Sequence, residues 1–433
     1  MLKQSQLALV LALIAAVSAW CFLDFVLIPH QVADAAKTGL PRGNLSDLYP
    51  RWLGARQLLL RGRDPYSADV TREIQAGYYG RPIDPSRPGD PKDQQAFAYP
   101  LYVVFLLAPT VHLPFPVVQR VFGWLLVLLT AVSIPFWLRA LRWRLPLLVV
   151  VTWMVAALGS FPAIQGLKLQ QLSLLVCVLL AACIAALASG FPVLAGILLA
   201  LATIKPQLAG ILAAWLVLWA LSDWRRRQRL LWSFGLSMLV LVVAAEILLP
   251  GWIGRFRAAA SAYWQYTGGG KSVLDVAMGT VLGKAVAALI LVALAAFCWR
   301  LRREPADSPT FAWAFCSVLA VTLVVIPTYA LYNQLLLLPV LMLVLRSAPS
   351  LWEKGRLQRF FGIITALCVL WPWLTAAILD LALLVLPGPV VQQAWAVPLG
   401  PSLAVPVTVL GMLAVSANMA LATREPSPAS SRR

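Results

Sequence analysis

A polar stretch after the first long apolar run holds the side chains best suited to chemistry. Residues 46–67 read SDLYPRWLGARQLLLRGRDPYS, and Asp47 is the second of them. A carboxylate at this place could take the proton from an attacking hydroxyl group. The alternative interpretation is structural, because Ser46 or Asp47 would make a good N-cap for a following helix, with Pro50 tolerated in its first turn. Both roles stay open for Asp47.

The chemistry that one such carboxylate suits is the transfer of a sugar from a lipid phosphate to a hydroxyl group. The departing phosphate carries its own negative charge, so it needs cations or hydrogen-bond donors rather than an acid. One carboxylate is therefore enough, whereas glycoside hydrolysis uses two.

Two further polar residues interrupt apolar sequence. A lysine such as Lys205 is costly inside a membrane span and indicates a functional site. The alternative is that its side chain reaches from a helix break to the surface. Gln171 could hydrogen-bond a sugar or a phosphate, or it could join two helices.

Other charged residues compete with these candidates. Asp24, Glu246 and Asp380 lie in or near apolar runs, and each could be the base or the partner of an arginine. Arg51 and Arg56 could attract an anionic substrate, or they could face lipid headgroups.

Aromatic residues gather in a second polar segment, near residues 250–280. They are Trp252, Tyr263, Trp264 and Tyr266. Such residues usually form a belt at the membrane interface, and the alternative is a platform for sugar rings or isoprenoid.

The six cysteines all lie in apolar runs without a CxxC pair, and there are only two histidines. We therefore expect no metal and no cofactor.

The elements that position these residues are membrane helices. The chain has 433 residues, of which 61% are hydrophobic and 12% charged, and its mean hydropathy is +0.81. Continuous apolar runs of about 18 residues or more predict transmembrane helices. The fold class is therefore all-α, a polytopic bundle. The net charge of +18 fits basic loops on the cytoplasmic side of a membrane rather than nucleic-acid binding.

The apolar runs predict about twelve spans in one domain, residues 1–433. They cover roughly residues 7–29, 98–113, 116–138, 146–160, 168–189, 192–222, 230–249, 281–300, 311–327, 331–347, 360–386 and 402–422. The first is predicted to be a retained anchor rather than a cleaved signal, because it is long for a signal core and many spans follow it. Lys205-Pro206 interrupts the sixth, which is one broken helix or a hairpin of two.

Residues 30–97 form the first external loop in this topology, which puts both termini in the cytoplasm. Leu48, Trp52 and Ala55 follow a helical stripe that predicts an amphipathic helix over 48–61 on the outer membrane surface, ended by Gly62. The tail, residues 424–433, is predicted to be disordered.

One basic loop conflicts with this topology. RALRWRLP, residues 139–146, would lie outside, against the positive-inside rule. Either the segment 98–113 is re-entrant, or the rule fails locally.

The polar stretch resembles the opening loop of glycosyltransferase family 87, whose members are integral-membrane enzymes of the glycosyltransferase C type. The matching residues are Asp47, Tyr49, Gly62 and Tyr66. Three later stretches agree in order, namely FAYPLYVVFLLAPTVHLPF (97–115), LQQLSLLVCVLL (169–180) and LAGILLALATIKPQL (194–208), with a weaker echo in PTYALYNQLLLLP (327–339).

The resemblance implies an inverting transferase that moves a sugar, mannose by expectation, from a polyprenyl phosphate to a hydroxyl group of a lipid or glycan. Asp47 would be the general base, at the external face of a bacterial inner membrane. The donor-binding candidates are Lys205, Gln171, Tyr332, Asn333, Tyr49 and Arg51. The family often has a histidine where this chain has Tyr332 and Asn333, and these can donate a hydrogen bond but no positive charge.

Two other classes of function remain possible from the sequence. A transporter or lipid flippase would use polar residues and broken helices, and it often shows inverted repeats. No repeat is evident here, and the polar residues are concentrated in one loop. A scaffold without activity would explain the spans but not the ordered motifs.

Overall fold

The computed structural model describes residues 2–37, 46–84, 86–87, 89–266, 270–327 and 329–422, which fold into helices without any strand. The tail expected to be disordered lies outside these residues. The α-helices are α1 (Leu2–Phe22), α2 (Ile28–Lys37), α3 (Leu48–Arg61), α4 (Ala68–Tyr79), α5 (Val103–Leu107), α6 (Phe115–Ala140), α7 (Leu147–Leu158), α8 (Phe161–Lys168), α9 (Leu172–Ala188), α10 (Pro192–Ala202), α11 (Pro206–Leu221), α12 (Trp224–Leu248), α13 (Trp252–Tyr266), α14 (Val273–Met278), α15 (Thr280–Leu301), α16 (Pro309–Val325), α17 (Leu338–Lys354), α18 (Arg356–Ala382), α19 (Gly388–Gln392) and α20 (Ala404–Ala422). Shorter segments are the π-helix η1 (Leu23–Leu27) and the 3-10 helices η2 (Ala108–Thr110), η3 (Leu331–Leu337) and η4 (Val397–Leu403).

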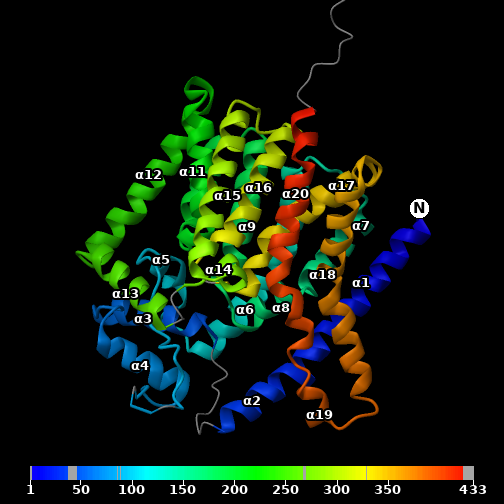
Figure 1. Cartoon of the computed structure of the whole chain (residues 1–433). Coiled ribbons are helices and arrows are strands. Elements are labelled where there is room, and N and C mark those ends of the chain that lie inside the picture. The colour runs from blue at the N-terminus through cyan, green and yellow to red at the C-terminus, as the bar shows by residue number, and fades with distance from the viewer. Residues whose placement is uncertain are drawn as a thin grey trace, which may run out of the picture.

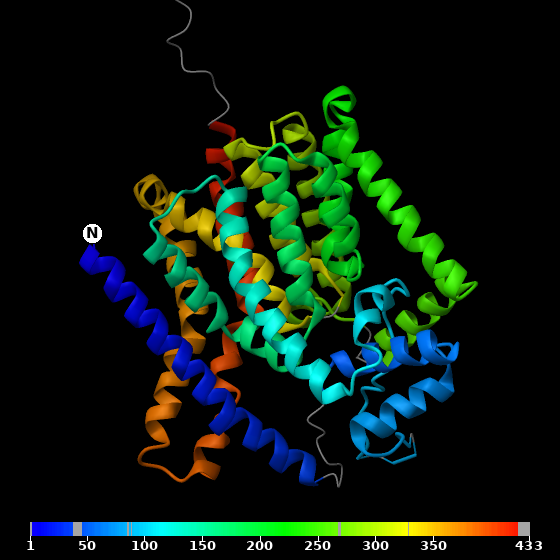
Figure 2. The ribbon, with the colours of Figure 1, turned by 180° about the vertical axis from the view of Figure 1, so that it is seen from behind.

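Seven helical segments of the described residues are long and apolar enough to cross a membrane. They are Lys3–Lys37, Phe115–Ala140, Trp224–Leu248, Thr280–Leu301, Leu331–Pro349, Arg356–Ala382 and Gly388–Ser416. The pair α7 and α8, bent by 58°, would be an eighth, and α9, α10, α11 and α16 are apolar but shorter. Figures 1 and 2 show these helices side by side, with α1 on the outside against α7 and α18.

The segment 98–113 does not form a membrane-spanning helix, which corrects one predicted span. Its α-helix, α5, has five residues and rises about 7.5 Å, whereas a bilayer core is about 30 Å thick. Prolines at positions 100, 109 and 114 interrupt the helical hydrogen bonds. The segment packs against α3 instead, where Trp52 Nε1 donates to the Thr110 carbonyl at 3.2 Å.

The apolar run around Lys205 is a hairpin of two short helices rather than one broken crossing. α10 follows α9 after a turn at residues 189–191. Lys205 lies beside the start of α9, where its ammonium donates to Gln171 Oε1 at 2.8 Å. Trp219, near the end of α11, donates to the Glu304 carbonyl in the loop between α15 and α16. The chain therefore turns back at Lys205.

The basic loop 139–146 lies at the end of the molecule where α9 stops. Arg139 Nε donates to Ser189 Oγ at 2.9 Å, and Arg142 pairs at 2.7 Å with Asp307, in the loop between α15 and α16. This loop therefore shares one end with the basic residues that end α15. If the segment that contains α5 does not cross, this loop lies on the same side as the other basic loops, as the positive-inside rule expects.

The helix α3 has the predicted bounds, and its apolar face is buried in the protein rather than laid on a membrane. Its C-cap Gly62 adopts the left-handed conformation, with φ of 62°. Leu48, Trp52 and Ala55 are at most 4% exposed. Figure 1 shows α3 and α4 beside α13, at one end of the bundle. The prediction of a surface helix is wrong for this face, because α5 and the segment before it cover the apolar stripe.

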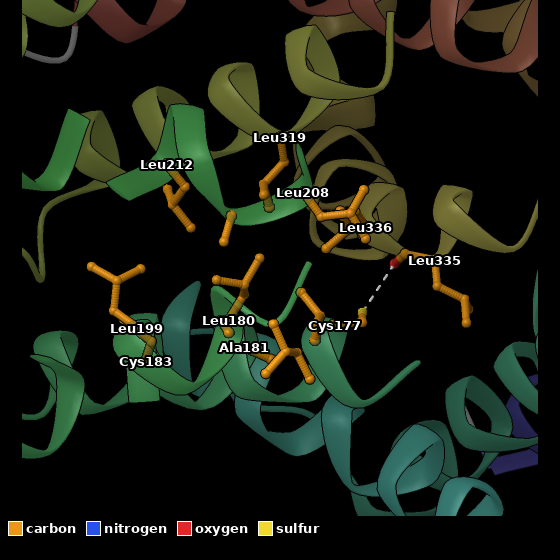
Figure 3. Close-up of a cluster of buried hydrophobic side chains, with 14 of the residues drawn as sticks. Cys177, Leu180, Ala181, Cys183, Leu199, Leu208, Leu212, Leu319, Leu335 and Leu336 are labelled. Carbon is orange, nitrogen blue, oxygen red and sulfur yellow. Dashed lines mark hydrogen bonds between the residues drawn. The ribbon is translucent and has the colours of Figure 1, made fainter. Parts of the chain in front are cut away.

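A close-packed core holds α9 and α11 in place behind these elements. Figure 3 shows Leu180 and Ala181 of α9 facing Leu208 of α11 and Leu336 of η3. Cys177 Sγ contacts the Leu335 carbonyl at 3.6 Å. All six cysteines are free thiols, and four of them are buried. The cysteines therefore fill small spaces, as expected.

Candidate active site

Three helices begin near one place, and a polar residue precedes each of them. Asp47 precedes α3, Gln171 precedes α9 and Lys205 precedes α11. None of the three side chains accepts a hydrogen bond from its own helix. The positive ends of three helix dipoles therefore adjoin these residues. Asp47 takes the N-cap position, but its side chain does not act as a cap.

Asp47 is held on several sides. Its backbone N–H donates to the Leu169 carbonyl at 3.0 Å, and its own carbonyl accepts from Arg51 at 2.5 Å. Its carboxylate accepts a hydrogen bond from Gln171 Nε2. Burial raises the pKa of the Asp47 carboxyl above its usual value of 3.8, and the nearby cations offset only part of this rise. A raised pKa makes the carboxylate a stronger base.

Lys205 lies on the other side of the same glutamine. Its ammonium donates to Gln171 Oε1 at 2.8 Å and to Ser173 Oγ at 2.7 Å. It is 5% exposed and lies 5.0 Å from the centre of the Tyr332 ring. An ammonium group has three N–H donors, and the described residues supply acceptors for two. The third is available to an anion in the site.

Ser173 continues this network to the late segment of the chain. Its hydroxyl donates to Asn333 Oδ1 at 2.8 Å. Asn333 is buried, at 7% exposure, and no acceptor for its amide N–H₂ group is found among the described residues. The late segment and the start of α9 are therefore one hydrogen-bonded unit.

These residues surround one cavity of about 570 Å³. Six of the seven predicted site residues line it, namely Asp47, Arg51, Gln171, Lys205, Tyr332 and Asn333. Tyr49 does not line it. Its ring packs against Trp52 and Phe115 at 5.9 and 4.9 Å between centres, and its hydroxyl lies against Gly77 of α4. Tyr49 therefore joins α3 to its neighbours.

The cavity also has residues that the sequence analysis did not nominate. Tyr99 lines it, and the Arg51 guanidinium lies 4.7 Å from the centre of its ring. Burial raises the pKa of Tyr99 to about 12, so its hydroxyl stays protonated and can donate. Because Tyr99 lies in the FAYPLY stretch that resembles the family, the sequence alone could have nominated it as a site residue. Asp93 and Arg257 also line the cavity, and no motif marks either of them.

A comparison with known families identifies the family of the chain. The sequence profile described as Glycosyltransferase family 87 matches residues 97–328, more than half of the chain. The chain belongs to glycosyltransferase family 87. This family 87 protein is thus a membrane glycosyltransferase, and the transporter alternative loses its support. No curated protein and no solved structure matches the chain.

The family 87 match covers only part of the cavity. Tyr99, Gln171 and Lys205 fall within the matched residues, whereas Asp47 precedes them and Tyr332 follows them. The role of Asp47 therefore rests on the geometry and on the motif resemblance.

The other acidic candidates of this family 87 protein lie outside the cavity. Asp24 is exposed on η1. Glu246 accepts from the Gly251 backbone N–H at 2.7 Å and closes a local turn. Asp380 accepts from Ser18 Oγ at 2.5 Å and joins α18 to α1. None of these three carboxylates therefore contributes to the cavity.

The aromatic residues of the second polar segment divide into two groups. Tyr263, Trp264 and Tyr266 of α13 line the cavity. Trp252 is buried, and its ring packs edge-on against Tyr102 at 5.8 Å. The first group can therefore contact a substrate, whereas Trp252 holds α13 against the core.

Proposed function

We propose that this transferase moves a sugar, mannose by expectation, from a polyprenyl phosphate to a hydroxyl group of a lipid or glycan, with inversion. The observation that carries the proposal is the chain of contacts from Asp47 through Gln171 to Lys205 in one cavity. Gln171 separates the Asp47 carboxylate from the Lys205 ammonium. Such a separation suits a base that contacts the acceptor hydroxyl and a cation that contacts the departing phosphate.

Asp47 is the general base in this proposal. One carboxylate oxygen accepts from Gln171, and the other takes the proton of the acceptor hydroxyl. The hydroxyl oxygen then bonds to the anomeric carbon as the bond from that carbon to the phosphate oxygen breaks. Attack from the face opposite the phosphate inverts the anomeric configuration, and the electron pair leaves with the phosphate.

Lys205 and two helix ends hold the departing phosphate. The free N–H donor of the Lys205 ammonium and the positive ends of α9 and α11 are suited to an anion. Arg51, which also lines the cavity, adds a second cation. Tyr332 and Asn333 supply neutral donors where relatives have a histidine.

A lipid donor fits the position of the cavity. Aromatic side chains of α13 line one side of the cavity, where they can pack against isoprenoid.

We propose the expected total of about twelve spans. In this topology α7 with α8 and the four shorter apolar helices cross the membrane together with the seven long segments. All the basic loops would then face the cytoplasm and the cavity would face the outside of the inner membrane.

The test is sugar transfer by the purified full chain with Asp47→Asn. Radiolabelled polyprenyl-phosphate-mannose and a membrane lipid extract are the substrates. Loss of the base lowers the rate about 10²–10⁴-fold. The fold is retained, because asparagine can still accept from Gln171 and removes a buried charge.

Asp24→Asn is the matched control, since Asp24 is exposed and outside the cavity. It should keep wild-type transfer. Equal transfer by Asp47→Asn and wild type would disprove the role of Asp47. A wild-type chain that neither transfers nor binds this donor would disprove the donor.

A further inference from the structure

A second cavity lies at the end of the molecule opposite Asp47, with a volume of about 980 Å³. The helix α9 connects the two places, because Gln171 at its start lines the first cavity and Ala188 at its end lines the second. Its 17 residues span about 25 Å. The second cavity is therefore separate from the site of sugar transfer.

Four arginines line this second cavity, namely Arg139, Arg142, Arg144 and Arg346. One of them is paired, at 2.7 Å, with Asp307. Two others are positioned by single hydrogen bonds, Arg139 to Ser189 Oγ and Arg346 to the Leu141 carbonyl. A guanidinium group has five N–H donors, so most of these donors remain available. The lining has a strong excess of positive charge.

The rest of the lining is apolar. Leu138, Leu145 and Val150 stand beside the arginines, and the neighbouring Leu147 is 76% exposed. A small soluble anion would gain nothing from these side chains. A phospholipid uses both parts, because guanidinium groups bind phosphate with paired hydrogen bonds and the aliphatic side chains contact the acyl chains.

This end of the molecule also carries other basic residues. Arg227 of α12 donates to the backbone carbonyls of Arg302, Arg303 and Glu304, which joins two basic stretches here. Basic groups at the ends of membrane helices attract acidic lipids. We propose that the arginine-lined cavity binds the headgroup phosphate of an acidic phospholipid, at a site distinct from the one that transfers sugar.

The test is lipid binding by the full chain in detergent, measured by native mass spectrometry. Phosphatidylglycerol and phosphatidylcholine with identical acyl chains are the two probes. Phosphatidylglycerol should bind, and the double variant Arg139→Gln with Arg144→Gln should raise its dissociation constant at least about tenfold. The single variant Arg144→Gln should show a smaller rise. It keeps the contact of Arg139 with Ser189, so it decides the question if the double variant does not fold.

The matched control removes the same charge from the same end. Arg225 and Arg229 are exposed on α12 and do not line the cavity, so Arg225→Gln with Arg229→Gln should leave the dissociation constant unchanged. Equal weakening by both double variants, or equal binding of both lipids by wild type, would overturn the proposal. Displacement of the lipid by millimolar sn-glycerol 3-phosphate would also overturn it, because the occupant would then be a soluble phosphate.

Discussion

At the scale of single residues, Gln171 decides how the two charges of the site behave. A direct ion pair between Asp47 and Lys205 would hold the carboxylate as the partner of the ammonium. The amide of Gln171 stands between them, donating to one and accepting from the other. In the proposed reaction, this separation leaves the carboxylate available to a hydroxyl group and the ammonium available to a phosphate.

The raised pKa of Asp47 predicts the acid side of the pH profile. A base works only when deprotonated, so kcat/KM should fall as the pH decreases through a value above the usual 3.8 of a carboxyl group. The measurement is kcat/KM against pH for wild type. If kcat/KM instead falls at an apparent pKa at or below this usual value, the group that titrates is not a carboxyl group whose pKa is raised by burial.

The same shift predicts a change in stability. The folded protein binds the Asp47 proton more tightly than the unfolded chain does, so this residue destabilises the fold as the pH rises through its pKa. Asp47→Asn should therefore raise Tm relative to wild type more at neutral than at acidic pH. Thermal melts at both pH values check this, and a gain that is independent of pH would count against it.

At the scale of elements, the site depends on where helices begin. The hairpin of α10 and α11 brings Lys205 back to the start of α9, and close packing of α10 on α12 holds the hairpin. A Cβ atom at Gly196 of α10 would lie 2.7 Å from the backbone of Leu230 and of Phe234 in α12. The glycine in the LAGILLALATIKPQL stretch therefore has a packing role.

This contact predicts the effect of two alanine substitutions. Gly196→Ala should destabilise the protein by about 1–3 kcal/mol, because the backbone of α12 must move. Gly210→Ala in α11 is the matched control, since no atom lies within 4 Å of its Cβ position. It should be neutral or stabilising by up to about 1 kcal/mol. Thermal melts of both variants check this, and equal losses would show that the contact is not limiting.

At the scale of the whole molecule, the short helix α5 decides the topology. Because its segment does not cross, residues 139–146 join the other basic loops at the end away from Asp47. Lipid-facing helices such as α12 and α15 are largely exposed along their length, as expected for a protein whose outer surface meets acyl chains. The molecule therefore has one basic end and, at the other end, the cavity that we propose for sugar transfer.

Labelling of single introduced cysteines checks this arrangement in cells. Ala68→Cys, exposed on α4, should react with a membrane-impermeant maleimide from outside. Arg144→Cys should react only after the membrane is opened. Wild type reports the background from the native cysteines. Reaction of both from outside would restore the predicted crossing at 98–113.

The sequence by itself determined the membrane class, the helical fold and the family, because apolarity, helical period and short motifs are local properties. It also placed the helix 48–61, since Gly62 ends it, and it nominated Asp47, Gln171 and Lys205 through their motifs. These residues stand out because a polar side chain beside or within an apolar run is visible without any partner.

Only the tertiary structure decided which of the candidates meet. Asp47 and Gln171 are 124 residues apart, and their contact depends on how α3 and α9 pack. The same packing set Tyr49 apart from the cavity, added Tyr99 and Asp93 to it, and buried the face of α3 expected to lie on the membrane. Side-chain proximity across a fold is a property of packed helices, and no local pattern contains it.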